Sequence, residues 1–139
     1  MSKKRIVIEG KVTCGAGMGA YYIKAYLDKM NEKLNFIPYA GTLNIELNKK
    51  FINIDFDKYA SVIIDEFKKD DLLFGMVKFI PAKLIKNRNF GEENCFIDCF
   101  IAIPKRTHHK GVIEIISSLN LRKEMDLCNG DVIELIING

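Results

Sequence analysis

The stretch TLNIEL, residues 42–47, alternates polar and apolar side chains without interruption. On an extended chain its three apolar residues point to one side and its three polar residues point to the other. A strand of this kind covers a core with one face and leaves the other face free. The stretch therefore predicts a half-buried strand, and similar patterns recur on both sides of it.

We expect further strands over residues 5–13, 59–67, 72–85, 95–103, 112–116 and 132–137, and a short one over 21–23. Gly10, inside the first of these, marks a bend or a bulge. Apolar residues at helical spacing predict one clear helix from Ile23 to Leu34, which Asn35 and Pro38 end. Residues 121–127 predict one or two helical turns.

The order of these elements indicates the fold class. Helices do not alternate with the strands, which argues against a doubly wound sheet. The pattern favours one compact, mainly antiparallel β-barrel. A length of 139 residues suits a single domain over 1–139, and we see no linker or repeat that would divide it.

Composition narrows the classes of function. The net charge of +3 is compatible with an anionic ligand but is too small to indicate nucleic acid. The first apolar run ends too early for a signal peptide and no stretch is long enough to span a membrane, so we expect a cytoplasmic protein. Its four cysteines are then expected to stay reduced, and Cys95 and Cys99 lack a histidine at the spacing of a zinc site.

The first candidate site is the glycine-rich run GAGMGA, residues 15–20, which follows the first predicted strand. A backbone with so few side chains can approach a phosphate closely and turn its N–H groups toward it. The run matches neither the Walker loop nor the dinucleotide-binding fingerprint. The alternative is a tight connection, or a place where two backbones pack closely.

Further polar residues suit chemistry, each with a plain alternative. Thr42 and Asn44 share one face of their strand, and their neutral oxygens suit a magnesium ion whose shell is completed by phosphates and waters; a solvated face is the alternative. The loop PKRTHHK, residues 104–110, either holds an anion or is solvated. Glu114, in the apolar run VIEII, is either an outward-facing residue or a carboxylate held in a cleft. Arg122 either contacts a phosphate or base, or lies exposed at a helix start.

Six motifs in this order resemble those of the archaeal CTP-dependent riboflavin kinases. They are I-x-G-x-V at 8–12, the glycine-rich loop at 15–19, P-Y-x-G-T-L-N at 38–44, P-K-x-T-x-H at 104–109, I-x-I-I at 113–116 and L-R-x-x-x-x-L-x-x-G-D-x-I at 121–133. The third motif is the most specific, and together they cover nearly the whole chain.

The resemblance implies a six-stranded cradle-loop barrel related to the RIFT fold, with one main helix and short helical turns. It implies a kinase that transfers the γ-phosphoryl group of CTP to the 5′-hydroxyl of riboflavin, giving FMN and CDP, with one Mg²⁺ ion. We expect a monomer that binds neither nucleic acid nor membranes and has no N-terminal helix-turn-helix domain.

The resemblance also implies roles for individual residues. Thr42 and Asn44 would bind magnesium, Asn44 and Glu114 would serve catalysis, and Thr107 and Glu114 would contact the flavin. The nucleotide would lie against two segments, formed by Gly15, Ala16, Gly17, Met18, Gly19 and Ala20 and by Leu119, Asn120, Leu121 and Arg122.

The chain departs from the family pattern at Met18 and Ala20, where that pattern has an acidic residue and an arginine. Lys24 or Arg122 could replace the missing positive charge. Two other functions stay open as alternatives: a swapped-hairpin-like DNA-binding barrel and a flavin-binding protein without catalysis. The first has no use for G-T-L-N, and the second leaves the glycine-rich run unexplained.

Overall fold

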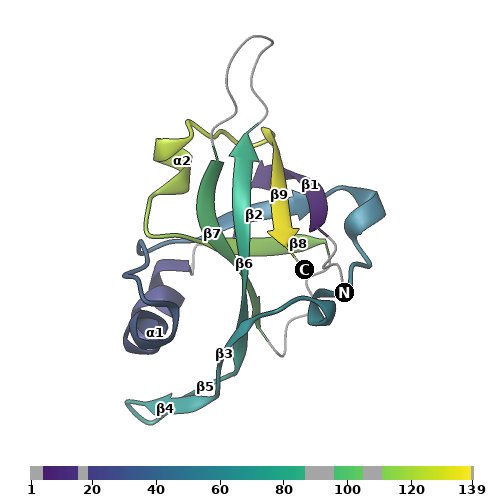
Figure 1. The fold of residues 1–139 in the computed structure, drawn as a ribbon. Helices are drawn as coiled ribbons and strands as arrows, with labels where there is room; N and C mark the ends of the chain where they lie inside the picture. The colour runs from purple at the N-terminus through teal and green to yellow at the C-terminus, as the bar shows by residue number, and fades with distance from the viewer. Residues whose placement is uncertain (1–4, 16–18, 87–95, 105–110, 139) are drawn as a thin grey trace.

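The computed structural model describes residues 5–15, 19–86, 96–104 and 111–138 (Figure 1). The elements in chain order are β1 (Arg5–Thr13), α1 (Gly19–Leu34), β2 (Leu43–Leu47), the 3-10 turns η1 (Lys49–Phe51) and η2 (Phe56–Lys58), β3 (Val62–Ile64), β4 (Phe67–Lys69), β5 (Leu72–Phe74), β6 (Val77–Lys86), β7 (Phe96–Pro104), β8 (Val112–Ile116), α2 (Leu121–Glu124) and β9 (Val132–Asn138).

Six strands close into an antiparallel barrel in the order β6-β7-β8-β2-β1-β9, with β9 pairing back onto β6. The long strand β6 makes this closure possible because one of its edges serves two partners. Its first three residues pair with β3, and Lys83 to Lys86 pair with β9. The predicted six-stranded barrel with one main helix and short helical turns is therefore confirmed.

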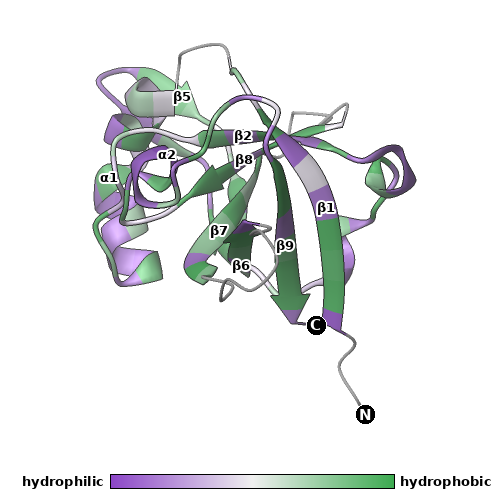
Figure 2. Ribbon diagram, turned by 90° about the horizontal axis from the view of Figure 1, so that it is seen from above, coloured by the Kyte–Doolittle hydropathy of each residue, from purple (hydrophilic) through white to green (hydrophobic). Residues whose placement is uncertain are grey.

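Alternate residues of the strands fill the barrel. In β2, Leu43, Ile45 and Leu47 are buried, whereas Asn44 is half-buried and Glu46 is exposed. The same core contains residues from the other strands of the barrel, among them Ile8, Leu84, Ile101, Ile113, Ile115, Ile133, Leu135 and Ile137. In Figure 2, β9 and β7 are mostly hydrophobic along their length. The alternation predicted for residues 42–47 is confirmed, and it leaves Asn44 on the outside of the barrel.

Helix α1 covers part of this outer surface. Its buried residues pack in a second hydrophobic cluster with residues of β3, β6 and β8: Ile23, Tyr26, Met30, Leu34, Ile64, Val77, Phe79 and Ile116. The helix ends as predicted, because Asn35 adopts a left-handed φ of 58° and its N–H donates to the carbonyl of Asn31 at 3.2 Å. No helix within the described ranges combines the length and the apolar character needed to cross a membrane.

Three predicted strands and the predicted bulge at Gly10 differ from the structure. Residues 21–23, predicted as a short strand, lie in α1, which begins at Gly19. Burial of Ile23 on the inner face of this helix outweighs the strand preference of the two tyrosines. The predicted strand over 59–67 shortens to β3 and the first residue of β4, and the one over 72–85 is interrupted between β5 and β6. Of the bend or bulge predicted at Gly10, the bulge is excluded, since the pairing of β1 with β2 and β9 runs through this residue without a break.

Closure of the barrel can be tested at Leu135, which pairs with Ile8 of β1 and Leu84 of β6; all three are fully buried. Leu135→Ala is expected to lower the free energy of unfolding by about 2–5 kcal/mol, because it leaves a cavity among three strands. Urea unfolding followed by circular dichroism measures the change. Val132→Ala, on the exposed part of the same strand, should cost about 0.5 kcal/mol; equal losses for the two variants would contradict the closed core.

Candidate functional site

A row of side chains crosses neighbouring strands on the outer face of the barrel. Thr13 of β1 pairs with Asn44 of β2, and Asn44 pairs in turn with Glu114 of β8. Ala102 of β7 completes the row opposite Glu114. Residues directly opposed in an antiparallel pair have Cβ atoms about 4.5–5.5 Å apart. Strand register alone therefore places an amide and a carboxylate side by side, although they lie far apart in the sequence.

Thr42 joins this row from the residue just before β2. Its hydroxyl donates a hydrogen bond to Oε1 of Glu114 at 3.3 Å. Thr42, Asn44 and Glu114 line one cavity and offer the oxygen ligands that magnesium prefers. Since the Thr42 proton is used in the bond to Glu114, lone pairs of its oxygen stay free for a cation. The described residues contain no group of three His, Cys, Asp or Glu side chains that could hold a metal.

Two glycines lie directly against these polar side chains. A Cβ atom on Gly15 would collide with the side-chain amide of Asn44, and one on Gly19 would lie 2.6 Å from Oγ1 of Thr42. Any larger residue at either position would displace the polar row. The absence of a side chain at Gly19 thus brings the first turn of α1, whose N–H groups have no partner within the helix, next to Thr42.

The cavity at this point measures about 620 Å³ and is lined by Cys14, Gly15, Gly19, Ala20, Tyr22, Gly41, Thr42, Asn44, Glu114, Arg122 and Asn129. Arg122 is the single Lys or Arg among these lining residues. Its guanidinium donates to the carbonyl of Thr13 at 3.1 Å and to Oδ1 of Asn129 at 2.7 Å. Asn129 in turn donates to Sγ of Cys14 at 2.8 Å. Neutral acceptors hold the guanidinium, so its charge is available to an anion in the cavity, next to the positive end of α1.

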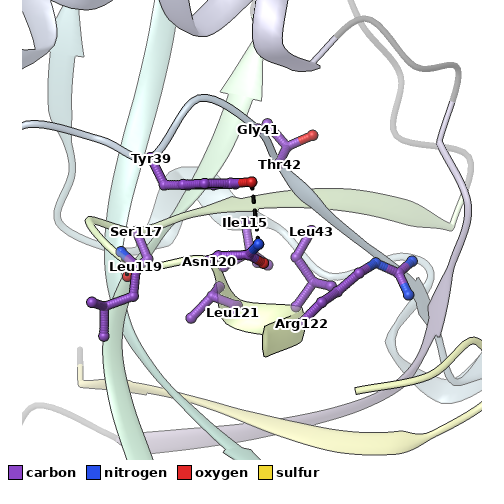
Figure 3. A pocket seen from close by; sticks show the side chains of 10 residues that line it. All are labelled: Tyr39, Gly41, Thr42, Leu43, Ile115, Ser117, Leu119, Asn120, Leu121 and Arg122. Atoms are coloured by element: carbon purple, nitrogen blue, oxygen red, sulfur yellow. Dashed lines mark hydrogen bonds between the residues drawn. The ribbon is translucent and has the colours of Figure 1, made fainter. Parts of the chain in front are cut away.

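Two smaller cavities adjoin the large one. The first, of about 230 Å³, lies between α1 and the barrel and is mostly apolar: Tyr22, Ile23, Tyr26, Met30, Thr42, Val77, Phe79, Ala102, Pro104, Glu114 and Ile116. The second, of about 220 Å³, lies beside the start of α2 (Figure 3): Tyr39, Gly41, Thr42, Leu43, Ile115, Ser117, Leu119, Asn120, Leu121 and Arg122. Thr42 lines all three cavities. Glu114 is shared by the large and apolar cavities, and Arg122 by the large cavity and the one beside α2.

Tyr26 holds the far wall of the apolar cavity in place. Its hydroxyl donates to the carbonyl of Gly75 at 2.7 Å, and its ring meets those of Phe67 and Phe74 edge-on. Burial, with a smaller contribution from Tyr22, raises the pKa of this phenol, which therefore stays neutral. The wall presents an apolar surface with its polar atom already bonded, which suits a flat, largely apolar ligand.

Comparison with known proteins shows the family of the chain. The family model CTP-dep_RFKase, described as "Domain of unknown function DUF120", matches residues 12–137. The chain belongs to the CTP-dependent riboflavin kinase family. It is 42% identical over 134 residues to a riboflavin kinase of Thermoplasma acidophilum, a match that covers 93% of this chain and 56% of that protein.

Two shorter riboflavin kinases match over nearly their whole length. The protein of Methanococcus vannielii is 37% identical over 132 residues, which is 93% of this chain and 95% of that one. The protein of Sulfurisphaera tokodaii is 36% identical over 141 residues, which is 97% of each. The chain thus spans about half of the Thermoplasma relative and almost all of these two.

The departure from the CTP-dependent riboflavin kinase pattern at Ala20 has a structural counterpart. Ala20 lines the large cavity, as does Arg122. Lys24 is exposed on α1 and is not among the described residues that line the three cavities. Of the two residues expected to replace the arginine of that pattern, Arg122 is the one that borders the same cavity as Ala20.

The structure brings together most of the residues singled out from the sequence. Thr42, Asn44, Glu114 and Arg122 share the large cavity, as do the glycine-run residues Gly15, Gly19 and Ala20. Leu119, Asn120 and Leu121 line the adjoining cavity with Arg122. Ala16, Gly17, Met18 and Thr107 lie outside the described residues, as do Cys95 and most of the loop at 104–110, so predictions for these positions remain predictions.

Sequence reasoning missed two polar residues and one apolar cavity of this candidate site. Tyr39 belongs to the P-Y-x-G-T-L-N motif, so the motif itself could have drawn attention to it. Asn129 lies between the helical turns predicted over residues 121–127 and the strand predicted over 132–137, and no local pattern links it to Arg122. The apolar cavity forms only when α1 packs on the barrel, which helical periodicity does not reveal.

Proposed function

We propose that the chain transfers the γ-phosphoryl group of CTP to the 5′-hydroxyl of riboflavin, giving FMN and CDP. The observation that carries this proposal is the set of three adjoining cavities, with Thr42 in the wall of each and Glu114 between the apolar one and the large one. A phosphoryl donor and its acceptor have to meet in line, and this boundary is where ligands of the two cavities would meet. The family and the names of the relatives indicate the two substrates.

The apolar cavity is the proposed flavin site. The isoalloxazine ring is flat and largely apolar, and the cavity between α1 and the barrel offers aromatic and aliphatic walls, including Tyr22 and Phe79. Two of its polar residues, Thr42 and Glu114, also border the large cavity. A flavin whose ring lies between the apolar walls would direct the polar chain that bears the 5′-hydroxyl toward Glu114.

The large cavity is the proposed phosphate site. The N–H groups at the start of α1 and the guanidinium of Arg122 would bind the phosphate oxygens. Thr42 and Asn44 would hold a magnesium ion, which when bound neutralises phosphate charge. These two ligands bring no charge of their own, so we expect the ion to bind together with the nucleotide rather than before it.

Glu114 is the proposed partner of the acceptor hydroxyl. The bond from Thr42 fixes one of its oxygens, and the other is then directed to the 5′-hydroxyl. In the transfer, the bond between the γ-phosphorus and the β,γ-bridging oxygen breaks while the bond to the 5′-oxygen forms. Glu114 accepts the hydroxyl proton as that new bond forms, and releases it to solvent afterwards.

Occupancy of the phosphate site can be followed at Cys14, an exposed thiol in the wall of the large cavity. CTP with magnesium is expected to slow alkylation of Cys14 by iodoacetamide severalfold, because the bound phosphates would obstruct the thiol. Peptide mass spectrometry measures the extent at each cysteine. Cys128, which is exposed but does not line the cavity, should react at an unchanged rate. Equal protection of both thiols would argue against nucleotide binding in this cavity.

The proposed reaction is tested by mixing the protein with riboflavin, magnesium and each nucleoside triphosphate in turn, and separating the flavins by chromatography. FMN formed only or mainly with CTP is the expected result. No FMN with any triphosphate would overturn the proposal, and riboflavin binding without turnover would then favour the non-catalytic flavin-binding alternative.

A further inference from the structure

We propose that Tyr39 recognises the base of the nucleotide, by stacking through its ring and by donating its phenolic proton to the base edge. The inference rests on the function proposed above and assigns a residue to the selection of the nucleotide. It starts from the cavity beside α2, which adjoins the phosphate cavity through Gly41, Thr42 and Arg122. A nucleotide with its phosphates at Arg122 can place its base in this adjoining space.

The Tyr39 ring is held at the wall of that cavity. The backbone N–H of Tyr39 donates to the carbonyl of Ser117 at 2.8 Å, and Gly41 N–H donates to the carbonyl of Tyr39 at 2.8 Å. The ring packs over Gly41, where an added Cβ would lie 3.1 Å from Cε1 of the tyrosine. Tyr39 is nevertheless 44% exposed, so part of its ring is open to a ligand. A fixed aromatic ring with an open face is a stacking platform for a planar base.

The hydroxyl of Tyr39 has an unused proton. Nδ2 of Asn120 donates to this hydroxyl oxygen at 3.1 Å (Figure 3). Oδ1 of the same amide accepts the N–H of Lys123 at 3.4 Å, which keeps the amide nitrogen turned toward Tyr39. The phenol oxygen is thus already an acceptor, and within the described part of the chain no acceptor receives its proton. Asn120 in this way orients a free donor at the cavity wall.

The two other side-chain hydroxyls that line this cavity are already used, and that of Thr42 donates to Glu114. Ser117 is buried, donates to the carbonyl of Asp98 at 3.3 Å and accepts the N–H of Leu119 at 3.3 Å. Tyr39 therefore supplies the side-chain hydroxyl donor that a base can reach. Cytosine presents two adjacent acceptors, ring N3 and carbonyl O2, to such a donor. An aromatic face with one such donor fits a pyrimidine better than it fits a phosphate or a sugar.

The experiment measures the dissociation constants of CDP and of tripolyphosphate, a probe without a base, by titration calorimetry in the presence of magnesium. Tyr39→Phe keeps the ring and removes only the hydroxyl, and it is expected to weaken CDP binding roughly threefold to tenfold. Tyr39→Ala removes the stacking surface as well and should weaken CDP binding by a further factor of about ten. Binding of tripolyphosphate and riboflavin should be unchanged in Tyr39→Phe. Tyr59→Phe, which changes a tyrosine packed on the barrel core outside the three cavities, is the matched control.

Two results would overturn the inference. One is an unchanged affinity of Tyr39→Phe for CDP. The other is an equal loss of affinity for CDP and tripolyphosphate, which would show that Tyr39 only supports the shape of the site. Failure of the proposed function is a separate result, since it would appear as wild-type protein that makes no FMN from CTP. If the wild-type protein forms FMN from CTP and Tyr39→Phe binds CDP as tightly as the wild type does, the role of Tyr39 is contradicted and the proposed function is not.

Discussion

Asn44→Ala is expected to lower kcat for FMN formation roughly a hundredfold or more while the protein stays folded. The side chain is one of two proposed protein ligands for magnesium, and its partner Thr42 also brings no charge. Because Asn44 points away from the barrel core, its loss should leave the unfolding temperature close to that of the wild type. Steady-state rates at increasing magnesium concentration, together with thermal unfolding, measure both effects.

The matched control for this variant is Asn138→Ala, at the exposed end of β9. This variant also removes an asparagine side chain from a strand of the barrel, at a position far from the site. Full activity is therefore expected. An active Asn44→Ala enzyme with an unchanged dependence on magnesium would exclude Asn44 as a metal ligand.

Glu114→Gln is expected to lower kcat by about 10²–10⁴-fold. The amide oxygen can still accept the hydrogen bond from Thr42, so the shape of the site is kept while the carboxylate that would take the hydroxyl proton is lost. Riboflavin affinity should change only slightly, because the apolar walls provide most of the proposed contact surface. Single-turnover rates and flavin fluorescence titration separate the two quantities.

Glu46→Gln provides the comparison for Glu114. Glu46 lies on the outside of β2 opposite Val112, and it is exposed and outside the three cavities of the site. Its replacement should leave kcat unchanged. If Glu114→Gln turned over at the wild-type rate, Glu114 would have no role as a base and would act at most as a structural partner of Thr42.

The sequence was sufficient for the barrel strands that follow a clear pattern. The predicted bounds of β1 and β8 agree with the structure, the alternation in residues 42–47 placed Asn44 on the polar face of its strand, and Glu114 was expected to face outward or to lie in a cleft. Their direct opposition could not be predicted from these patterns, because it depends on the register between two strands far apart in the chain. Local pattern fixes the face of a residue, whereas pairing fixes its neighbour.

The glycine-rich run shows why two interpretations of one motif can both be relevant. The run predicts either a phosphate cradle or a place where two backbones pack closely. Gly15 and Gly19 do pack closely, and what they pack against are Asn44 and Thr42, the proposed metal ligands. The absence of side chains at these positions is therefore required by the polar row itself, and it also opens the cavity proposed for the phosphates.

The prediction of a short strand over residues 21–23 was wrong because packing, rather than local preference, decides the structure of this segment. Tyr21 and Tyr22 favour a strand locally, but burial of the face that contains Ile23 makes the segment helical from Gly19. That change moves the start of α1 to the edge of the site. Tyr39 and Asn129 likewise gain their positions from hydrogen bonds to distant segments, at Ser117 and Cys14.

The central claim is transfer of the terminal phosphoryl group of CTP to riboflavin, and labelled CTP tests it most directly. The protein is incubated with riboflavin, magnesium and CTP that carries radioactive phosphorus at either the γ or the α position, and the flavins are separated by chromatography. The account predicts labelled FMN from the γ-labelled nucleotide and unlabelled FMN from the α-labelled one. Label in the flavin from the α position, or no labelled flavin from the γ position, would contradict it.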